Sequence, residues 1–399
     1  MFLYRSSIRV GSLPVVAGLL WLALLAGGGA QPRNAGAPGV ALTQREIGEL
    51  KALGPWPPPV RIDPSNRVSG QPQAVELGQR LFRDPRMSPV GYIACVTCHQ
   101  PDRAFTDRKA RAHGLADLPR NTPSLFNLSQ QRWFGRDGAS DSLWLASIRP
   151  MLDEREFDGG AATTVKLFVR DPELAACYRK VFGVSPLQNS ERTVVNVGKA
   201  LAAYQETLVT GRTPFDDFRD ATIRGDASAA MRYPPAAQRG LKLFVGEAKC
   251  ISCHSGPNFS DDHFHKVMGG ANDDVDDGRL QGVRSVKSNV FNLASRYNDD
   301  ATRSNANATR QLVSDNSQRG QFRTPGLRNV ATTGPYMHDG RIDLLQHAVQ
   351  HGAPPHRSPS GAALTAAQAS DLVAFLATLT DRYGASRPWY PHQLVPCHQ

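Results

Sequence analysis

The hydrophobic positions of the chain recur mostly at helical spacing, and few stretches alternate in the way of a β-strand. From Glu191 to Leu208 the apolar residues fall three, four and seven positions apart, which predicts an amphipathic helix. A second helix is predicted from Leu364 to Thr380, where Thr365 and Gln368 form a capping box at its start. Between Gly269 and Gly320 the chain is polar with little periodicity, so we expect a solvated loop there. The whole pattern predicts a mainly α protein.

Two shorter segments with similar sequences, Leu77–Phe82 and Arg239–Phe244, also have the spacing of amphipathic helices. A Cys-x-x-Cys-His motif follows each of them. The first motif comprises Cys95, Cys98 and His99, and the second comprises Cys250, Cys253 and His254. This repeat indicates a duplicated domain. We therefore expect an N-terminal domain over residues 31–210 and a C-terminal domain over residues 211–399.

The spacing within each motif suits covalent attachment of haem. Two thiols three residues apart can add to the two vinyl groups of one haem, and the adjacent His can then bind the iron. Zinc is the alternative, because two Cys pairs could form a Cys₄ site. Zinc modules, however, usually place the pairs ~15–20 residues apart and need no His after each pair. We therefore expect two covalently attached haem c groups. Cys177 and Cys397 remain, and they could pair with each other or stay inert.

Residues 1–30 have the order of a secretory signal peptide: Arg5 and Arg9, then an apolar run from Leu13 to Leu25, then small residues. The run has about 13 residues, fewer than the ~20 that a membrane-spanning helix needs. We therefore expect a soluble periplasmic protein with no membrane span after signal removal. Export agrees with haem c, since its thioether bonds are made outside the cytoplasm.

The composition is typical of a globular protein, with 40% hydrophobic and 21% charged residues. The formal net charge is +10, but the Lys and Arg residues are scattered along the chain. Because no helix carries a basic stripe, we expect no nucleic-acid partner. A basic surface favours encounter with an acidic protein instead.

The chain resembles the bacterial di-haem cytochrome c peroxidase and MauG superfamily from about Gln44 to Leu379. Six segments carry the resemblance: Leu81–Pro85, Arg120–Leu125, Ser142–Trp144, Gly256–Phe259, Phe322–Val330 and Gly334–Arg341. The resemblance implies two c-type cytochrome domains that face each other, each with one covalently bound haem. It also implies that His99 and His254 are the proximal iron ligands.

For the N-terminal haem the resemblance implies a peroxide-reacting site. Glu156, six residues after Pro150, matches the distal glutamate that handles the peroxide proton. Composition alone would instead make Glu156 an exposed residue of an acidic run. Ala146 stands where the family usually has Gln, so one hydrogen-bonding partner for peroxide is missing. His113 matches the distal His that occupies the sixth iron site in classical peroxidases, or it lies exposed in its loop.

Between the haems, Asn121 and the backbone of Thr333 and Pro335 match the calcium site of the family. Arg136 occupies the position of the inter-haem tryptophan of the family. Three tryptophans, Trp133, Trp144 and Trp389, are candidates for carrying oxidising equivalents, although packing in the core is the default role of each.

The sixth ligand of the C-terminal haem separates the subclasses. Classical peroxidases supply Met and MauG supplies Tyr at a position that is Gly352 here, and Gly cannot ligate iron. The neighbouring His351 is therefore expected to be the ligand, with His347 and Met337 as competitors. An imidazole ligand would give this haem a lower reduction potential than a thioether would.

The function that the resemblance implies is a MauG-like reaction. Hydrogen peroxide would produce high-valent haem iron, and the enzyme would oxidise a Trp or Tyr of a secreted or periplasmic partner protein. The methanobactin-associated MbnH-type enzymes, which modify a Trp of a companion copper protein, are the subgroup that it resembles most. One alternative is a classical peroxidase that reduces hydrogen peroxide with electrons from a small redox protein. The other is a di-haem electron carrier without catalysis.

Overall fold

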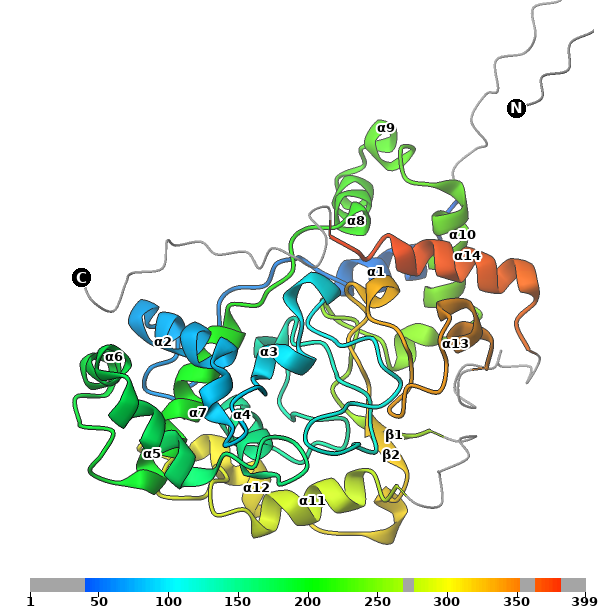
Figure 1. The fold of residues 1–399 in the computed structure, drawn as a ribbon. Helices are drawn as coiled ribbons and strands as arrows, with labels where there is room; N and C mark the ends of the chain where they lie inside the picture. Colours follow the sequence, from blue (N-terminus) through cyan, green and yellow to red (C-terminus); the bar gives the residue numbers. More distant parts are fainter. Residues whose placement is uncertain (1–39, 268–275, 352–362, 382–399) are drawn as a thin grey trace, which may run out of the picture. The chain divides into compact units, whose positions relative to one another are not determined.

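The computed structural model describes residues 40–267, 276–351 and 363–381. The predicted signal peptide lies outside these residues, as do Gly352, Trp389 and Cys397. Among the described residues, no helix is both long and apolar enough to cross a bilayer. The mainly α prediction is confirmed (Figure 1).

Helices carry nearly all of the regular structure. The α-helices are α1 (Gln44–Ala52), α2 (Pro72–Arg83), α3 (Cys95–Cys98), α4 (Leu143–Leu152), α5 (Gly160–Arg170), α6 (Pro172–Phe182), α7 (Ser190–Glu206), α8 (Pro214–Arg224), α9 (Ala227–Ala230), α10 (Pro235–Val245), α11 (Arg279–Ser288), α12 (Asn307–Arg310), α13 (Leu345–His351) and α14 (Ala366–Ala377). Two short strands, β1 (Phe264–Lys266) and β2 (Gln321–Arg323), pair antiparallel with His265 opposite Phe322. Short 3₁₀ turns connect several of these elements.

The predicted helices form where the sequence indicates. The predicted Glu191–Leu208 helix is α7, and the predicted terminal helix is α14. Both bonds of the expected capping box are present: the amide of Gln368 donates to Thr365 Oγ1 over 3.2 Å, and the amide of Thr365 donates to Gln368 Oε1 over 3.0 Å. The two short lead-in segments lie within α2 and α10.

These helices pack in two pairs, α2 against α7 and α10 against α14 (Figure 1), which is the arrangement a duplicated domain would give. Gly78 of α2 comes so close to α7 that an added Cβ would lie 2.0 Å from the carbonyl oxygen of Ala200. Gly240 of α10 has the same relation to α14, where an added Cβ would lie 1.9 Å from the carbonyl oxygen of Asp371. The same position of each lead-in sequence therefore carries the glycine that lets two helix backbones meet.

Two hydrophobic cores surround these helix pairs. The first core contains Phe82 and Tyr204, with ring centroids 5.2 Å apart, and the second contains Phe244 and Phe375, with centroids 5.0 Å apart. Each core also takes residues from beyond the boundary expected at residue 210. The first core includes buried residues between 291 and 306, and the second includes Leu50 of α1 and Leu53, which follows it.

The polar stretch from Gly269 to Gly320 is not the plain loop that we expected. Among its described residues, α11 buries Leu280, Val283 and Val286 on one face. An added Cβ on Gly282 would lie 2.0 Å from the carbonyl oxygen of Asp137, so α11 packs closely against that part of the chain. The three-residue spacing of its apolar side chains was the available signal, and the surrounding Asp, Asn and Ser residues masked it.

Candidate active site

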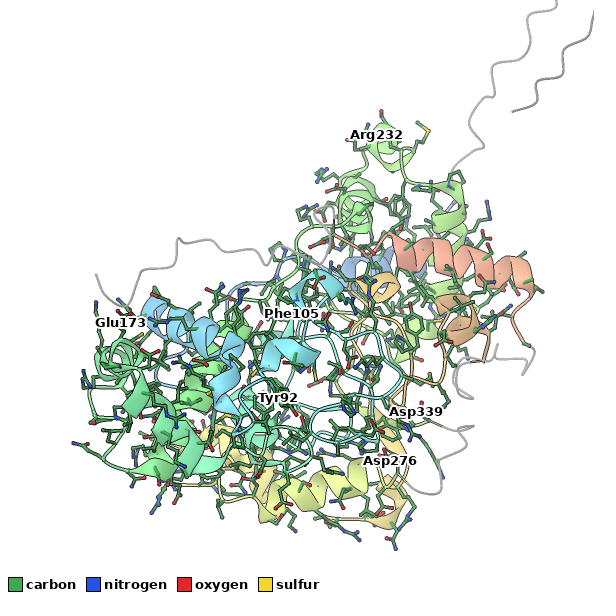
Figure 2. All side chains as sticks on the ribbon, in the orientation of Figure 1. Tyr92, Phe105, Glu173, Arg232, Asp276 and Asp339 are labelled. Atoms are coloured by element: carbon green, nitrogen blue, oxygen red, sulfur yellow. The ribbon has the colours of Figure 1, made fainter. Side chains whose placement is uncertain are left out.

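The two motif histidines have matching surroundings. His99 Nδ1 lies 3.0 Å from the carbonyl oxygen of Phe105, and His254 Nδ1 lies 3.1 Å from that of Phe259. Because a carbonyl can only accept, each Nδ1 carries the proton and each Nε2 keeps a lone pair for a metal. Phe105 and Phe259 have φ values of 56° and 55°, an uncommon conformation for bulky residues, and both are buried (Figure 2 labels Phe105). These backbone turns aim the two carbonyl oxygens at the imidazoles.

The four motif cysteines are free of disulfides and suit thioether attachment. Burial raises the pKa of the Cys95 thiol to about 12 and that of the Cys98 thiol to about 11. The charge of Glu156 contributes to both shifts, so its carboxylate lies near the first motif. Cys177, by contrast, is buried and takes part in a disulfide, so it is not an inert thiol.

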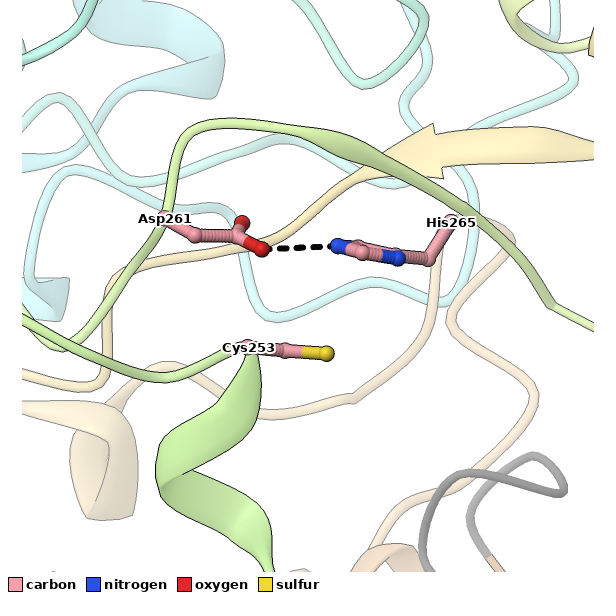
Figure 3. A group of neighbouring side chains, drawn as sticks. All are labelled: Cys253, Asp261 and His265. Atoms are coloured by element: carbon pink, nitrogen blue, oxygen red, sulfur yellow. Dashed lines mark hydrogen bonds and ion pairs between the residues drawn. The ribbon is translucent and has the colours of Figure 1, made fainter.

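The zinc alternative finds no support in the geometry. Among the described residues, no group of three or more closely spaced ligand side chains includes cysteines of both motifs. The one group found there joins Cys253, Asp261 and His265 (Figure 3). His265 Nε2 lies 2.8 Å from Asp261 Oδ2, and Cys253 belongs to the second haem motif. We therefore assign this group to the haem surroundings rather than to a separate metal.

Glu156 is held in place by the loop that carries His113. Helix α4, which contains Pro150, ends at Leu152, and Glu156 lies in the turn that follows. The amide of Leu115 donates to the carbonyl oxygen of Glu156 over 3.2 Å. An added Cβ on Gly114 would lie 2.7 Å from the Glu156 backbone, so only glycine fits there. Burial, and then the charge of Asp153, raise the pKa of the Glu156 carboxyl above its ordinary value.

The side chain of His113 turns away from this site. Its Nδ1 lies 2.7 Å from Asp117 Oδ1, and 55% of its side chain is exposed. Only its backbone faces the motif, with the carbonyl oxygen 3.7 Å from Cys98 Sγ. The structure therefore brings Glu156 to the first motif and leaves the imidazole of His113 in solvent.

A cavity of about 250 Å³ lies against the second motif. Apolar side chains form much of its wall, together with Cys250, Cys253 and His254. Four cationic side chains also line it, and no Asp or Glu does so among the described residues: Arg136, Lys249, Lys266 and Arg323. The Nε atoms of Arg136 and Arg323 are buried without a hydrogen-bond partner. An apolar slot lined by cationic side chains, two of which keep a buried Nε without a partner, fits a haem, whose flat ring carries two propionates.

The sequence analysis did not single out most of these cations, although two of them lie in or next to segments that it did name. Lys249 directly precedes Cys250, and Arg323 lies within the Phe322–Val330 segment. His338 also lines the cavity and stacks on Phe322, with ring centroids 3.8 Å apart. None of these positions stands out from composition alone, because the fold is what brings them to one cavity.

The three candidate ligands of the second haem lie at different positions relative to this cavity. Met337 lines the cavity, as do Leu345, Ala348 and Val349. His347 is exposed and does not line the cavity. His351 is the last residue of α13, three residues after Ala348, and its side chain lies outside the described part of the structure. Ligation by His351 stays a prediction.

Two of the residues predicted to hold calcium, Asn121 and Pro335, do meet, but in another arrangement. Asn121 Nδ2 donates to the carbonyl oxygen of Pro335 over 2.9 Å, while Asn121 Oδ1 accepts from Arg136 Nη2 over 2.7 Å. The hydroxyl of Thr333 donates to the carbonyl oxygen of Val330 over 3.2 Å. The fold thus joins Asn121 and Pro335 directly, with the guanidinium of Arg136 beside them.

Each tryptophan of the described residues has a cation over its ring. The guanidinium of Arg279 lies 4.5 Å from the ring centroid of Trp133, and the ammonium of Lys199 lies 5.4 Å from that of Trp144. Trp144 is fully buried and donates to Ser65 Oγ over 3.0 Å. Arg328 lies 3.8 Å from the ring centroid of Trp56.

Comparison with known proteins decides the family. Residues 72–225 match the family model described as di-haem cytochrome c peroxidase. The chain is also 32% identical over 381 residues to the methylamine utilization protein MauG of Methylorubrum extorquens, covering 92% of this chain and 95% of that protein. The chain belongs to the di-haem cytochrome c peroxidase and MauG family. It is therefore a haem-dependent oxidoreductase, and its two Cys-x-x-Cys-His motifs are those of a two-haem protein.

Members of both branches of the family are similar to this chain. The cytochrome c551 peroxidase of Nitrosomonas europaea is 28% identical over 335 residues, covering 84% of this chain and 86% of that protein. The crystal structure of the diheme peroxidase BthA from Burkholderia thailandensis gives a TM-score of 0.62 at 24% identity, over 82% of this chain and 88% of that one. A MauG-like protein associated with microbial copper homeostasis gives 0.60 at 24% identity, over 83% and 95%. The structural likenesses bear out the predicted fold class.

Proposed function

We propose that this protein is an exported periplasmic enzyme that reacts with hydrogen peroxide at its N-terminal haem while both haems are still oxidised. We further propose that it uses the oxidising equivalents to modify a Trp or Tyr of a partner protein. The observation that carries the first part is the position of His113. With its imidazole bound to Asp117 and exposed to solvent, this side chain is not poised to block the iron against peroxide.

Glu156 is the proton-handling residue of the proposed reaction. A haem in this site supplies the iron that takes up the oxidising equivalents of peroxide. Cleavage of the O–O bond requires that one oxygen lose a proton and the departing oxygen gain it. Glu156 lies near the first motif, and its raised pKa brings it closer to neutrality, where a carboxyl group both accepts and returns a proton. The loop bonds at Leu115 and Ala116 hold its backbone in position.

Support for a protein substrate comes from the MauG relative and from charge. A folded protein cannot enter a haem pocket, so its side chains can be oxidised only by transfer across a docked surface. The formal net charge of +10, which becomes +8 when Arg5 and Arg9 leave with the signal peptide, suits docking to an acidic partner. The resemblance to MbnH-type enzymes makes a companion copper protein the first partner to test.

A classical peroxidase is the second candidate. It is favoured by Met337, which lines the second cavity and offers a thioether ligand that would raise the potential of that haem. Similarity to the cytochrome c551 peroxidase supports it as well.

One experiment separates the candidates. The diferric holoenzyme is treated with one equivalent of hydrogen peroxide and followed by stopped-flow absorption and EPR, with and without prior reduction by one electron. Reaction of the fully oxidised protein, followed by mass gain on a Trp or Tyr of an exported partner, is the expected result. Reaction only after one-electron reduction, with rapid oxidation of a small cytochrome, would establish the classical peroxidase. No reaction in either state would indicate an electron carrier.

A further inference from the structure

Two of the three oxygen atoms predicted to bind calcium, those of Asn121 and Pro335, are already matched with N–H donors. Asn121 Oδ1 accepts from Arg136 Nη2 over 2.7 Å, and the carbonyl oxygen of Pro335 accepts from Asn121 Nδ2 over 2.9 Å. Calcium requires roughly six to eight oxygen ligands around one point. Here the amide group of Asn121 presents its nitrogen, not its oxygen, to Pro335. The side chain therefore does not fit a calcium ion shared by these two residues.

The orientation of Asn121 is fixed by its surroundings. Its backbone amide donates to the carbonyl oxygen of His338 over 3.0 Å, and the residue is 4% exposed. Turning the amide group by 180° would place its NH₂ against the guanidinium of Arg136, so that two donors would face each other. The carbonyl oxygen of Pro335 would then face the amide oxygen of Asn121, which cannot donate. Both contacts would be lost, so the arrangement observed is the one that satisfies all three groups.

Arg136 is itself held firmly in this position. Its carbonyl oxygen accepts from the amide of Arg323, in strand β2, over 2.8 Å. Among the described residues its side chain forms no ion pair, whereas Arg120 pairs with Asp137 and Arg323 pairs with Asp262. Arg136 therefore contributes a positive charge that no carboxylate offsets within the described residues.

The electrostatic environment also opposes a divalent cation. Burial, and then the charges of Arg323 and Arg120, lower the pKa of the Arg136 guanidinium to about 10. At neutral pH the group remains charged. A calcium ion placed beside Asn121 would meet this guanidinium at close range in a buried setting, where repulsion is weakly screened.

We propose that the guanidinium of Arg136 supplies the positive charge at the contact between Asn121 and Pro335. It takes the place of a calcium ion there. Its Nη2 binds Asn121 on one side. Its Nε is buried, unmatched, and belongs to a residue that lines the second haem cavity. One guanidinium thus links the segment around Asn121 to the surroundings of the second haem. This inference does not depend on the proposed function.

The wild-type holoenzyme provides the first test, which needs no variant. The protein is purified in calcium-containing buffer, desalted, and analysed for calcium by inductively coupled plasma mass spectrometry. Its Tm and haem spectra are then measured with EGTA and with millimolar calcium. We expect no stoichiometric calcium and no response to either addition. One calcium per chain, whose removal lowers Tm or alters the haem spectra, would overturn the proposal.

The second test removes the charge. Arg136→Gln keeps a hydrogen-bond donor but frees room for a cation, so we expect a lower Tm that millimolar calcium raises by about 3 °C or more. Arg132→Gln is the matched control, because Arg132 is exposed and lies in the same segment. If millimolar calcium changes the Tm of wild type, Arg136→Gln and Arg132→Gln equally, the proposal that Arg136 takes the place of calcium is contradicted. If Arg136→Gln does not fold, the calcium content of the wild type decides alone.

Discussion

The imidazole of His113 binds Asp117, 2.7 Å away, on the surface of the loop whose backbone passes beside Cys98. The side chain that would close the first haem to peroxide therefore has a partner elsewhere. The same loop, through Leu115 and Ala116, holds the backbone of Arg155 and Glu156. Its structural role is to position the glutamate, and this role does not need the imidazole.

His113→Ala should consequently leave the reaction of the diferric enzyme with peroxide nearly unchanged. We expect a rate within about twofold of wild type, because an exposed side chain that contacts no reacting atom contributes little to the barrier. Stopped-flow absorption measures the rate, and EPR of the resting protein measures the spin states. A low-spin signal that becomes high-spin in the variant would identify His113 as an iron ligand and contradict this expectation.

Glu156→Gln should slow the peroxide reaction by ~10²–10⁴, the usual contribution of one positioned acid–base group. Both haem spectra should stay the same, since the glutamate is not an iron ligand. Glu154→Gln is the matched control, because Glu154 is exposed two residues away in the same turn. A change smaller than about threefold, equal in both variants, would make Glu156 an ordinary surface residue.

The pH dependence of the same reaction follows from the raised pKa of Glu156. The carboxylate form accepts the peroxide proton, and the protonated form cannot. Because burial raises the pKa above its ordinary value of 4.5, the rate should fall with decreasing pH through a midpoint above 4.5. This acidic limb should be absent from the pH profile of Glu156→Gln. A wild-type midpoint at or below 4.5 would disagree with the buried environment.

The second haem allows a direct test of its predicted ligand. His351→Ala should convert one low-spin EPR signal to high-spin, since imidazole is a strong-field ligand. His347→Ala is the control and should have no effect, because His347 is exposed and does not line the cavity. If the low-spin signal survives in His351→Ala, the same measurement on Met337→Ala tests the thioether that does line the cavity.

The close packing of the helix pairs in the two cores leads to a prediction about Tm. Gly78→Ala and Gly240→Ala should each lower Tm by several degrees, since forcing an atom into a closed helix contact costs ~1–3 kcal/mol. Gly48→Ala in α1 is the control, because nothing lies within 4 Å of its added Cβ. That change should raise Tm slightly, as Ala favours the helix over Gly. An equal change in Tm for all three variants would mean that the paired helices move apart to admit the added methyl group at little cost.

The sequence predicted what depends on local spacing. Helices α7 and α14 follow from apolar periodicity, and both haem motifs follow from the spacing of their Cys and His residues. It could not predict which way a side chain turns within a loop, as for His113, because the loop is fixed by bonds to Arg155 and Glu156 rather than by its own sequence. Nor could it predict that Arg136 faces Asn121, since that contact depends on how distant segments pack.

The last prediction concerns the tryptophans named from sequence as carriers of oxidising equivalents. Removing an electron from an indole makes it a radical cation, and a guanidinium 4.5 Å from the ring centroid of Trp133 opposes this charge. Arg279 also lies 4.0 Å from the ring centroid of Phe264 and donates to the carbonyl oxygen of Gly138, so it is firmly held. We therefore expect peroxide-treated wild type to show little oxidation of Trp133 by peptide mass spectrometry. In Arg279→Gln the same peptide should gain oxygen several-fold more. Arg284→Gln, an exposed change on the same helix, should resemble wild type. Oxidation of Trp133 at equal yield in all three proteins would show that the cation does not protect the ring, and would restore Trp133 as a route for oxidising equivalents.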